Sequence, residues 1–368
     1  MDDVVRAVTE LSTRWADRLP DGGTAFSGLG VWPLLAVLAA AADEPGRSEL
    51  AAAAEIDPAT GSTRASELIG VLDGSPDLHA ALGVWVAEDL KLAESFGEVM
   101  PPALRGTLSG DPSRDKPMLD AWVREHTGGL IDQMPLTVTP DLVLALASAL
   151  SLRTTWVKPF DQDDRGRLTR TDSDLSSVRL HDDLTTVTVA GTEDVDVRLG
   201  FGTPDAGASQ VVVRLLDPPG SGVDGAHLLE RAESGTDVGP GLRVVTSIER
   251  RPDVQLSLPS FEVRADHDLM QHADLFGLTT VAQAPGGPGH FTRLSPELLR
   301  VSEAKQSVYA RFFATGFEAA VVTAVGMVRA SMSTPATKRL RVVLDRPFAF
   351  AAIHRPTGMP IVAGWVVP

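Results

Sequence analysis

The spacing of hydrophobic and polar positions changes near residue 140, from a helical period to the shorter period of strands. Residues 2–19 place apolar side chains on one face of a helix. Residues 31–42 are apolar on every side, which predicts a helix buried in the core. The other elements expected in this part are helices at 48–55, 63–72, 92–99 and 117–126 and a strand at 80–87.

Beyond residue 140, most segments have the length and composition of strands. Residues 142–156 are apolar and uncharged until Arg153, which fits either a helix or a strand buried on both faces. Strands are expected at 178–180, 186–190, 195–199, 210–216, 242–249, 254–263, 298–313, 340–344, 348–353 and 361–367, with helices near 226–233 and 266–276. No low-complexity linker or internal repeat divides the chain. We therefore expect a single interwoven α+β domain spanning residues 1–368.

Charge and composition exclude several classes of protein. The chain has 33 Lys and Arg against 49 Asp and Glu, a net charge of −16, which argues against binding to nucleic acid or to an anionic membrane surface. It has no Cys, so disulfides, thiol nucleophiles and zinc–thiolate sites are excluded. Only five of the basic residues are Lys. This bias is typical of a GC-rich genome and points to a prokaryotic source.

Neither a targeting segment nor an enzyme motif is found. Residues 1–6 lack the basic region and apolar run of a secretory signal, so we expect a protein of the cytoplasm or one released by a non-classical route. Residues 31–42 are too few to span a bilayer. The motifs of phosphate-binding loops, zinc proteases, nucleophile elbows and dinucleotide folds are missing. The eight His show no metal-ligand spacing. We expect no catalytic residues, cofactor or metal.

Residues 315–334 stand out because they alternate like a strand yet run into a loop-like tail. With a period of two, one face consists of Phe317, Ala319, Val321, Thr323, Val325 and Met327. The segment is nearly uncharged and contains no Pro, and it continues into Arg329-Ala330-Ser331-Met332-Ser333. From the period alone, a plain buried strand is the simpler interpretation.

Several motifs occur in the order and at the spacing typical of one family. They are 119–123 with Thr127, Gly129 and Ile131; 146–148 through 156–160; 258–263 with 268–269 and 275–278; Gly316 with 318–320; and 345–348, 356–358 and 364–368. In these motifs and their order the chain resembles the serpins over nearly its whole length. The resemblance implies an α+β fold of about eight to nine helices around three β-sheets, with residues 142–156 as a long central strand. It also implies an exposed reactive loop at about 314–335.

The resemblance further implies a mechanism that involves a serine protease as partner and no nucleic acid or membrane. The protease cuts the loop and forms an acyl-enzyme, and the loop then inserts as a new strand of the main sheet, as described for serpins in general. The hinge of that movement corresponds to Gly316, Phe317, Glu318, Ala319 and Ala320. The sheet opening corresponds to Ser27, Ser148, Trp156 and Gln306. We expect a monomer.

The resemblance also implies which bond is cut, because in serpins the residue before the cut usually lies fourteen positions after the hinge glycine. Counted from Gly316, that residue is Ala330, which places the cut between Ala330 and Ser331. A small residue before the cut suits an elastase-like or subtilisin-like protease. The alternative bond, Arg329–Ala330, would attract a trypsin-like protease with an acidic pocket. We favour the former bond.

Some positions depart from the family pattern and leave a second function open. Phe317 stands where a small residue is usual, and accommodating a large side chain in a packed site typically costs about 1–3 kcal/mol. Ala314 stands where an acidic residue is usual, and Gly28 and Gly30 replace a Pro and a Ser. The alternative is a non-inhibitory serpin, a binding or structural protein in which Phe317 slows loop insertion.

Overall fold

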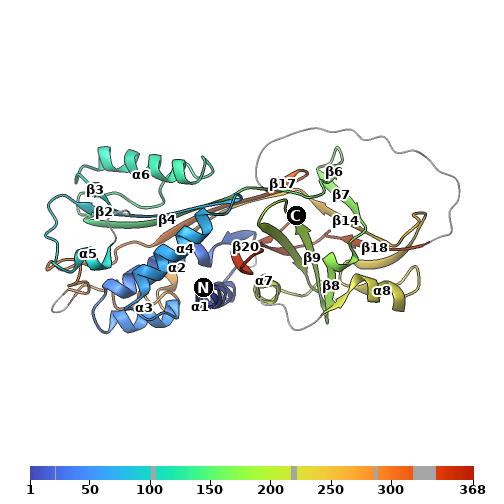
Figure 1. Cartoon of the computed structure of the whole chain (residues 1–368), viewed down its shortest axis with the longest axis horizontal. Helices are drawn as coiled ribbons and strands as arrows, with labels where there is room; N and C mark the ends of the chain where they lie inside the picture. The colour runs from blue at the N-terminus through green and yellow to red at the C-terminus, as the bar shows by residue number, and fades with distance from the viewer. Residues whose placement is uncertain (21, 101–104, 217–221, 286–288, 318–336) are drawn as a thin grey trace. The chain divides into compact units, whose positions relative to one another are not determined.

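The computed structural model describes all residues except 21, 101–104, 217–221, 286–288 and 318–336 (Figure 1). The chain divides into two compact units, each assembled from three segments. The first unit consists of Met1–Trp15, Phe26–Leu152 and Arg264–Tyr309, and the second of Ala16–Ala25, Arg153–Val263 and Ala310–Pro368. Across these described ranges, no helix is long and apolar enough to cross a membrane.

Helices dominate the first unit. They are α1 (Asp2–Ala16), α2 (Gly28–Ala41), α3 (Gly46–Ala54), α4 (Gly61–Asp73), α5 (Phe96–Val99) and α6 (Pro112–His126). The apolar helix α2 is buried along nearly its whole length and packs against α3, α4 and a strand. Its Trp32 is 1% exposed and donates from Nε1 to the carbonyl of Ala54 at 2.8 Å. The uniform apolarity of 31–42 is thus matched by neighbours on several sides.

A three-stranded sheet forms the second layer of the first unit, in the order β3 (Arg105–Leu108), β2 (Leu78–Ala87), β4 (Leu144–Leu152). Figure 1 shows α6 on one face of this sheet and α2 and α4 on the other. The ring of Trp85 contacts the ring of Trp122 on α6 edge-on, with centroids 4.9 Å apart. A Cβ on Gly83 or Gly106 would lie within 2.3 Å of the Trp85 indole, so both glycines make room for that ring.

The second unit contains two larger sheets. The seven-stranded sheet has the order β1 (Thr24–Phe26), β20 (Met359–Val366), β19 (Phe348–His354), β10 (Val195–Phe201), β9 (Leu184–Ala190), β8 (Val178–His181), β11 (Val223–Asp224). The six-stranded sheet has the order β12 (Asp237–Gly239), β13 (Leu242–Ser247), β18 (Thr337–Val343), β14 (Asp253–Pro259), β7 (Arg167–Asp172), β6 (Asp161–Gln162). Helix α7 (Ala208–Leu216) packs on β19 and β10, and α8 (Gly225–Arg231) packs on β18.

A fourth group of strands bears directly on the loop. Its order is β15 (Phe261–Asp268), β16 (Lys305–Phe313), β17 (Gly316–Phe317), β5 (Thr154–Thr155). The unit boundaries fall inside β15 and β16. By chain order β4 leads into β5, yet in the described residues β4 is an edge strand of its own sheet. Hydrogen bonding therefore groups the described strands into four sheets.

The α+β class and most helices of the first 130 residues are confirmed, whereas several other expected elements differ, among them the strand expected at 254–263, which is split between β14 and β15. Residues 210–216 belong to helix α7, because Val211, Val212, Leu215 and Leu216 form one buried helical face. Residues 266–268 continue strand β15, and only Leu269–His272 form a short 3₁₀-helix. The strand expected from 298 begins at Lys305, because backbone groups before it bond elsewhere, as Val301 does to Val281.

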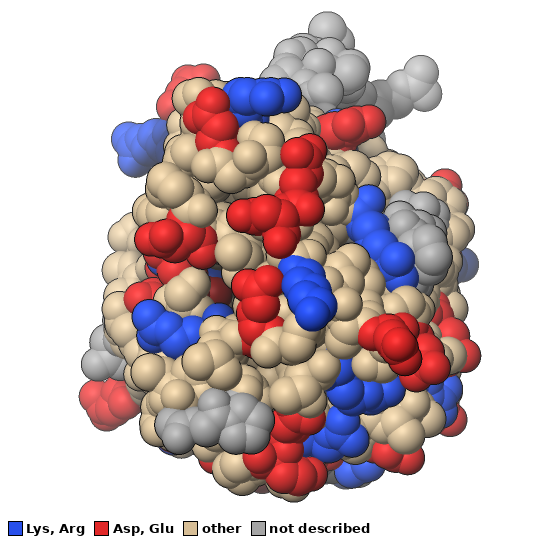
Figure 2. Space-filling model, turned by 90° about the vertical axis from the view of Figure 1, so that its left-hand side faces the viewer, with Lys and Arg blue, Asp and Glu red and all other residues tan. Residues whose placement is uncertain are grey.

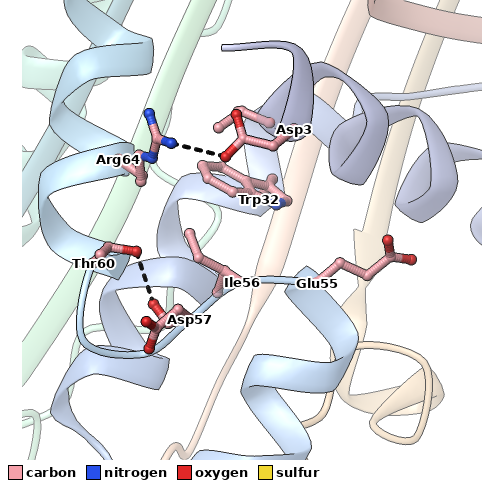
Figure 3. A pocket seen from close by; sticks show the side chains of 8 residues that line it. Asp3, Trp32, Glu55, Ile56, Asp57, Thr60 and Arg64 are labelled. Atoms are coloured by element: carbon pink, nitrogen blue, oxygen red, sulfur yellow. Dashed lines mark hydrogen bonds and ion pairs between the residues drawn. The ribbon is translucent and has the colours of Figure 1, made fainter.

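Acidic and basic side chains are interspersed on the face of the molecule drawn in Figure 2, with no continuous basic area among its described residues. A hollow of about 240 Å³ in the first unit is lined by Trp32 and several charged side chains (Figure 3). Arg64 there donates to Asp3 at 2.9 Å, and Glu55 pairs with Arg6 at 3.3 Å. Because these charges already neutralise one another, we assign no ligand to this hollow.

Candidate functional site

Gly316 and Phe317 form the two-residue strand β17, which is hydrogen-bonded on both sides. Gly316 lies opposite Phe313 of β16 and Thr155 of β5, and Phe317 occupies the next position of both ladders. The chain reverses direction between β16 and β17 within the two residues 314–315. The first residues after this turn are therefore already a strand between β16 and β5.

The two residues of β17 fit this position for different reasons. A Cβ on Gly316 would lie 2.4 Å from the carbonyl oxygen of Thr154, so only glycine allows the two backbones to approach this closely. Phe317 is 2% exposed, and its ring centroid lies 6.2 Å from that of Phe350 on β19. The large side chain is thus accommodated in the uncut chain.

Trp156 and Phe160 hold the turn that leads into β17. The backbone N–H of Trp156 donates to the carbonyl of Thr315 at 3.1 Å, and that of Phe160 donates to Ala314 at 2.7 Å. Nε1 of Trp156 donates to the carbonyl of Phe313 at 2.9 Å. Trp156 is 3% exposed, and its ring lies 4.7 Å from that of Phe312. Three successive carbonyls before Gly316 are therefore fixed by one short segment.

One buried cation lies beside this turn. Arg170 of β7 is 7% exposed and places its guanidinium 4.9 Å from the ring centre of Phe160. Burial lowers the pKa of Arg170 from its usual value. Throughout the described parts of the chain, no group of acidic or His side chains could hold a metal ion. The chemistry available here is strand pairing and packing.

A polar cluster in the first unit links α2 to two strands. Gln306 of β16 accepts from the backbone N–H of Ser27 and donates to the Ser27 carbonyl, both at 2.9 Å. The Ser27 hydroxyl caps α2 by accepting from the N–H of Gly30 at 3.0 Å. The Ser148 hydroxyl of β4 donates to the carbonyl of Gly30. The first turn of α2 thus bonds to one residue of β4 and one of β16.

The glycines of this turn make the cluster possible. A Cβ on Gly28 would lie 2.2 Å from the Ser12 hydroxyl of α1. A Cβ on Gly30 would lie 3.0 Å from Nε2 of Gln306. The long Gln306 side chain occupies the space that a side chain at position 30 would need.

The structure gathers the expected residues in two places. Ser27, Ser148 and Gln306 meet in the first unit, and Gly316, Phe317 and Trp156 meet in the second. The contact between Gln306 and Ser27 runs from the Gln306 side-chain amide to the Ser27 backbone. The other expected residues, Glu318, Ala319, Ala320, Arg329, Ala330 and Ser331, lie outside the described residues.

The strand that follows residues 318–336 is strongly anchored, and sequence reasoning missed this. Nζ of Lys338 donates to the carbonyls of Leu229 and Ala232 at 2.9 and 2.8 Å. Arg339 donates from Nε and Nη2 to the carboxylate of Asp253 at 2.6 and 2.7 Å, which raises the pKa of Arg339. The sequence predicted a hydrophobic strand only from Leu340, whereas β18 already begins at Thr337.

Comparisons with known proteins agree on one family. The family model described as serpin (serine protease inhibitor) matches residues 6–173 and 238–368. Plasminogen activator inhibitor 1 of Sus scrofa is 26% identical over 310 residues, which cover 79% of this chain and 72% of that protein.

Two solved structures share the fold at low sequence identity. The native state of tengpin, a thermophilic serpin, has a TM-score of 0.71 and 17% identity, covering 99% of this chain and 94% of its own. Thyroxine-binding globulin in complex with thyroxine has a TM-score of 0.68 and 16% identity, covering 100% of this chain and 99% of its own.

Proposed function

Because this chain belongs to the serpin family, we propose that it is a suicide-substrate inhibitor of serine proteases, with its reactive loop at about 314–335. The serine hydroxyl of the protease attacks the carbonyl carbon of Ala330, and the peptide bond to Ser331 breaks. The amine of Ser331 takes a proton and leaves, and Ala330 stays attached to the protease as an ester. The segment before Ala330 then inserts into the main sheet and carries the attached protease away from the place where it cut the loop.

The observation that carries this proposal is the position of β17. Gly316 and Phe317 are already paired between β16 and β5, so the segment after them would extend an existing strand. In the first unit, the proposed strand would pair with β4, which is an edge strand among the described residues. Ser148 of β4 and Gln306 of β16 both bond to the first turn of α2 there. An unpaired edge is a ready acceptor for a further strand.

Strand addition supplies the driving force in this proposal. About a dozen added ladder residues, at roughly 1 kcal/mol per net hydrogen bond, contribute on the order of 10 kcal/mol. Burial of Val321, Val325 and Met327 adds about 1.5–3 kcal/mol each. Ordering the segment costs roughly 1–2 kcal/mol per residue and offsets much of this gain. Strain released from the uncut fold supplies the remainder.

The residue before the cut sets the target class. Ala330 suits a small or undemanding primary pocket, so we propose an elastase-like or subtilisin-like protease. Cleavage at Arg329–Ala330 by a trypsin-like protease is the alternative. We also propose a monomer, and the preference for Arg over Lys favours a bacterial source.

Inhibition can be tested by mixing the protein with elastase, subtilisin and trypsin and separating the products on denaturing gels. We expect an SDS-stable complex with elastase or subtilisin, and sequencing of the released C-terminal peptide should begin at Ser331. A Thr323→Pro variant should be cut at the same bond without forming the complex, because Pro removes a ladder hydrogen bond from the added strand. Clean cleavage without any stable complex would contradict inhibition.

A second function is kept open by Phe317 and by one structural neighbour. The buried Phe317 ring could hold the hinge in place and slow insertion, leaving a protein that is cut but does not trap its protease. Thyroxine-binding globulin, solved with thyroxine bound, has the same fold. Replacing Phe317 by Thr distinguishes the two functions. A gain of stable complex in Phe317→Thr, with none in the wild type, would favour the non-inhibitory alternative.

A further inference from the structure

We infer that residues 248–252, the connection between β13 and β14, form a second contact surface for the protease that cuts the loop. The inference rests on the proposed function. All five of these residues are described by the structure, and we call them the 248–252 turn. The preferred partner is a protease with acidic side chains and an apolar spot beside its active-site cleft.

The topology places this turn at the end of the loop. Strand β18 lies between β13 and β14, with Ser247 opposite Thr337 on one side and Asp253 opposite Arg339 on the other. The five residues that join β13 to β14 must therefore cross the end of β18 at which Thr337 begins. Thr337, the first described residue after the proposed loop, lies at this same end.

Hydrogen bonds fix the 248–252 turn to β18. The Thr337 hydroxyl donates to the carbonyl of Glu249 at 2.8 Å and lies 3.5 Å from that of Arg251. At the two ends of the turn, Ser247 is 3% exposed and Asp253 is 5% exposed. Asp253 accepts both hydrogen bonds from Arg339. A surface that is already ordered loses little conformational entropy when a partner binds.

The side chains that the turn presents are unusual for this chain. Ile248 is 83% exposed, the highest value among the large hydrophobic side chains that the structure describes. Arg250 and Arg251 follow it, and both are exposed. The chain as a whole carries a net charge of −16, so this pair of cations is opposite in sign to the charge of the whole protein. An exposed aliphatic side chain beside arginines suits a protein contact, because Arg is enriched in interfaces.

The length of the chain limits how far the cut bond can lie from the turn. Six residue steps separate Ser331 from Thr337. At no more than about 3.6 Å per residue, the bond lies within about 22 Å of Thr337. A protease domain of 200 residues has a radius of gyration of about 16 Å. A protease bound at Ala330–Ser331 therefore brings its surface within reach of the turn.

The chemistry of the turn predicts how it acts. Arg250 and Arg251 would speed the approach of an acidic protease surface, and this contribution would weaken with salt. Ile248 would add a contact that does not depend on salt. The choice of target protease would then depend on the protease surface around its active-site cleft as well as on its primary pocket.

The test measures the second-order rate of loop cleavage by elastase, subtilisin and trypsin, with product identity checked by sequencing. We expect the Arg250→Glu/Arg251→Glu variant to be cut about tenfold more slowly by the most acidic of these proteases at low salt, and the difference to shrink at 1 M NaCl. Ile248→Ser should slow cleavage about threefold at both salt concentrations. Arg179→Glu, an exposed cation on β8, is the matched control and should keep the wild-type rate.

The outcomes separate this inference from the proposed function. Rates of both turn variants within twofold of the wild type, for every protease that cuts within 318–336, would overturn the inference and leave inhibition intact. Slower cleavage of the variants without any SDS-stable complex would support the inference and contradict inhibition. Failure of all three proteases to cut within 318–336 would overturn both. Melting temperatures equal to the wild type confirm that the variants fold.

Discussion

Phe317 connects the hinge to a group of buried aromatic side chains in the second unit. Its ring lies beside that of Phe350, and the ring of Phe350 lies 5.2 Å from that of Phe261. Phe261 in turn stacks on Phe312 at 5.4 Å. The sequence predicted that insertion would have to accommodate this large side chain. In the structure, the Phe317 ring is instead already packed before any cut.

Replacing Phe317 by Ala should destabilise the uncut protein by about 3 kcal/mol, through lost burial and the cavity left beside Phe350. Urea unfolding followed by tryptophan fluorescence measures the change. A Phe317→Leu control should lose much less, because it retains most of the apolar volume. If Phe317→Ala unfolded at the wild-type urea concentration, the ring would not be buried in solution.

His354 is a buried titratable side chain at the end of β19. It is 4% exposed, and its Nδ1 lies 2.8 Å from the Thr357 hydroxyl. Burial lowers the pKa of His354 below its usual value of 6.5, although the charge of Asp194 opposes this. Below pH 6.5 the unfolded chain therefore binds a proton more readily than the folded chain does.

Stability should fall as the pH drops from 6.5 toward the lowered pKa of His354, since protonation then favours the unfolded chain. Carboxylates also titrate in acid, so the comparison is with a His354→Gln variant, which cannot take up this proton. Melting temperatures at pH 7.5 and 5.5 should differ more for the wild type than for the variant. Equal differences would show that His354 does not contribute.

At the scale of elements, β18 is the best-anchored strand next to the loop. It forms six residue pairs with β13 and five with β14. Lys338 adds two bonds to the end of α8, and Arg339 adds the paired contact to Asp253. Pairing on both edges explains how a strand with two cations near its start can lie inside a sheet.

Arg339→Met should lower stability by about 3–5 kcal/mol, because it leaves the buried Asp253 carboxylate without its cation. The double variant Arg339→Met/Asp253→Leu should recover most of that loss, since replacing both partners of a buried pair with apolar side chains is often neutral. Thermal unfolding of the two variants makes the comparison. A double variant as unstable as the single one would show that packing, and not the orphaned charge, sets the cost.

For the whole molecule, the proposed insertion involves one group of contacts in each unit. In the second unit, β17 is paired on both sides, with β16 and with β5. In the first unit, the start of α2 bonds to both β4 and β16 through Ser148 and Gln306, and the described residues of these two strands share no backbone ladder. In the proposed function, the added strand would supply such a ladder.

Cleavage within 318–336 should therefore raise the melting temperature. In a chain of 368 residues, each 1 kcal/mol of net gain in the free energy of unfolding corresponds to a rise of roughly 1 °C. Differential scanning calorimetry of the intact and cut protein measures it. Thr323→Pro should reduce the rise, and an unchanged melting temperature in the cut wild type would contradict strand addition.

The sequence by itself determined the family, the α+β class and most helices of the first 130 residues, because helical periodicity and ordered motifs are local signals. It also singled out Gly316 and Phe317 as a pair. Short elements escaped it: residues 210–216 have the composition of a strand, and only packing of their buried face on β19 and β10 makes them helical.

Only the tertiary structure decided how distant residues meet. Nothing local to Gln306 indicates that its amide bonds the backbone of Ser27, 279 residues away along the chain. Nothing local to 248–252 indicates that these residues cross the end of β18, because strand order depends on pairings between segments about 90 residues apart. Such contacts depend on where the backbone of other elements runs, which a single segment does not encode.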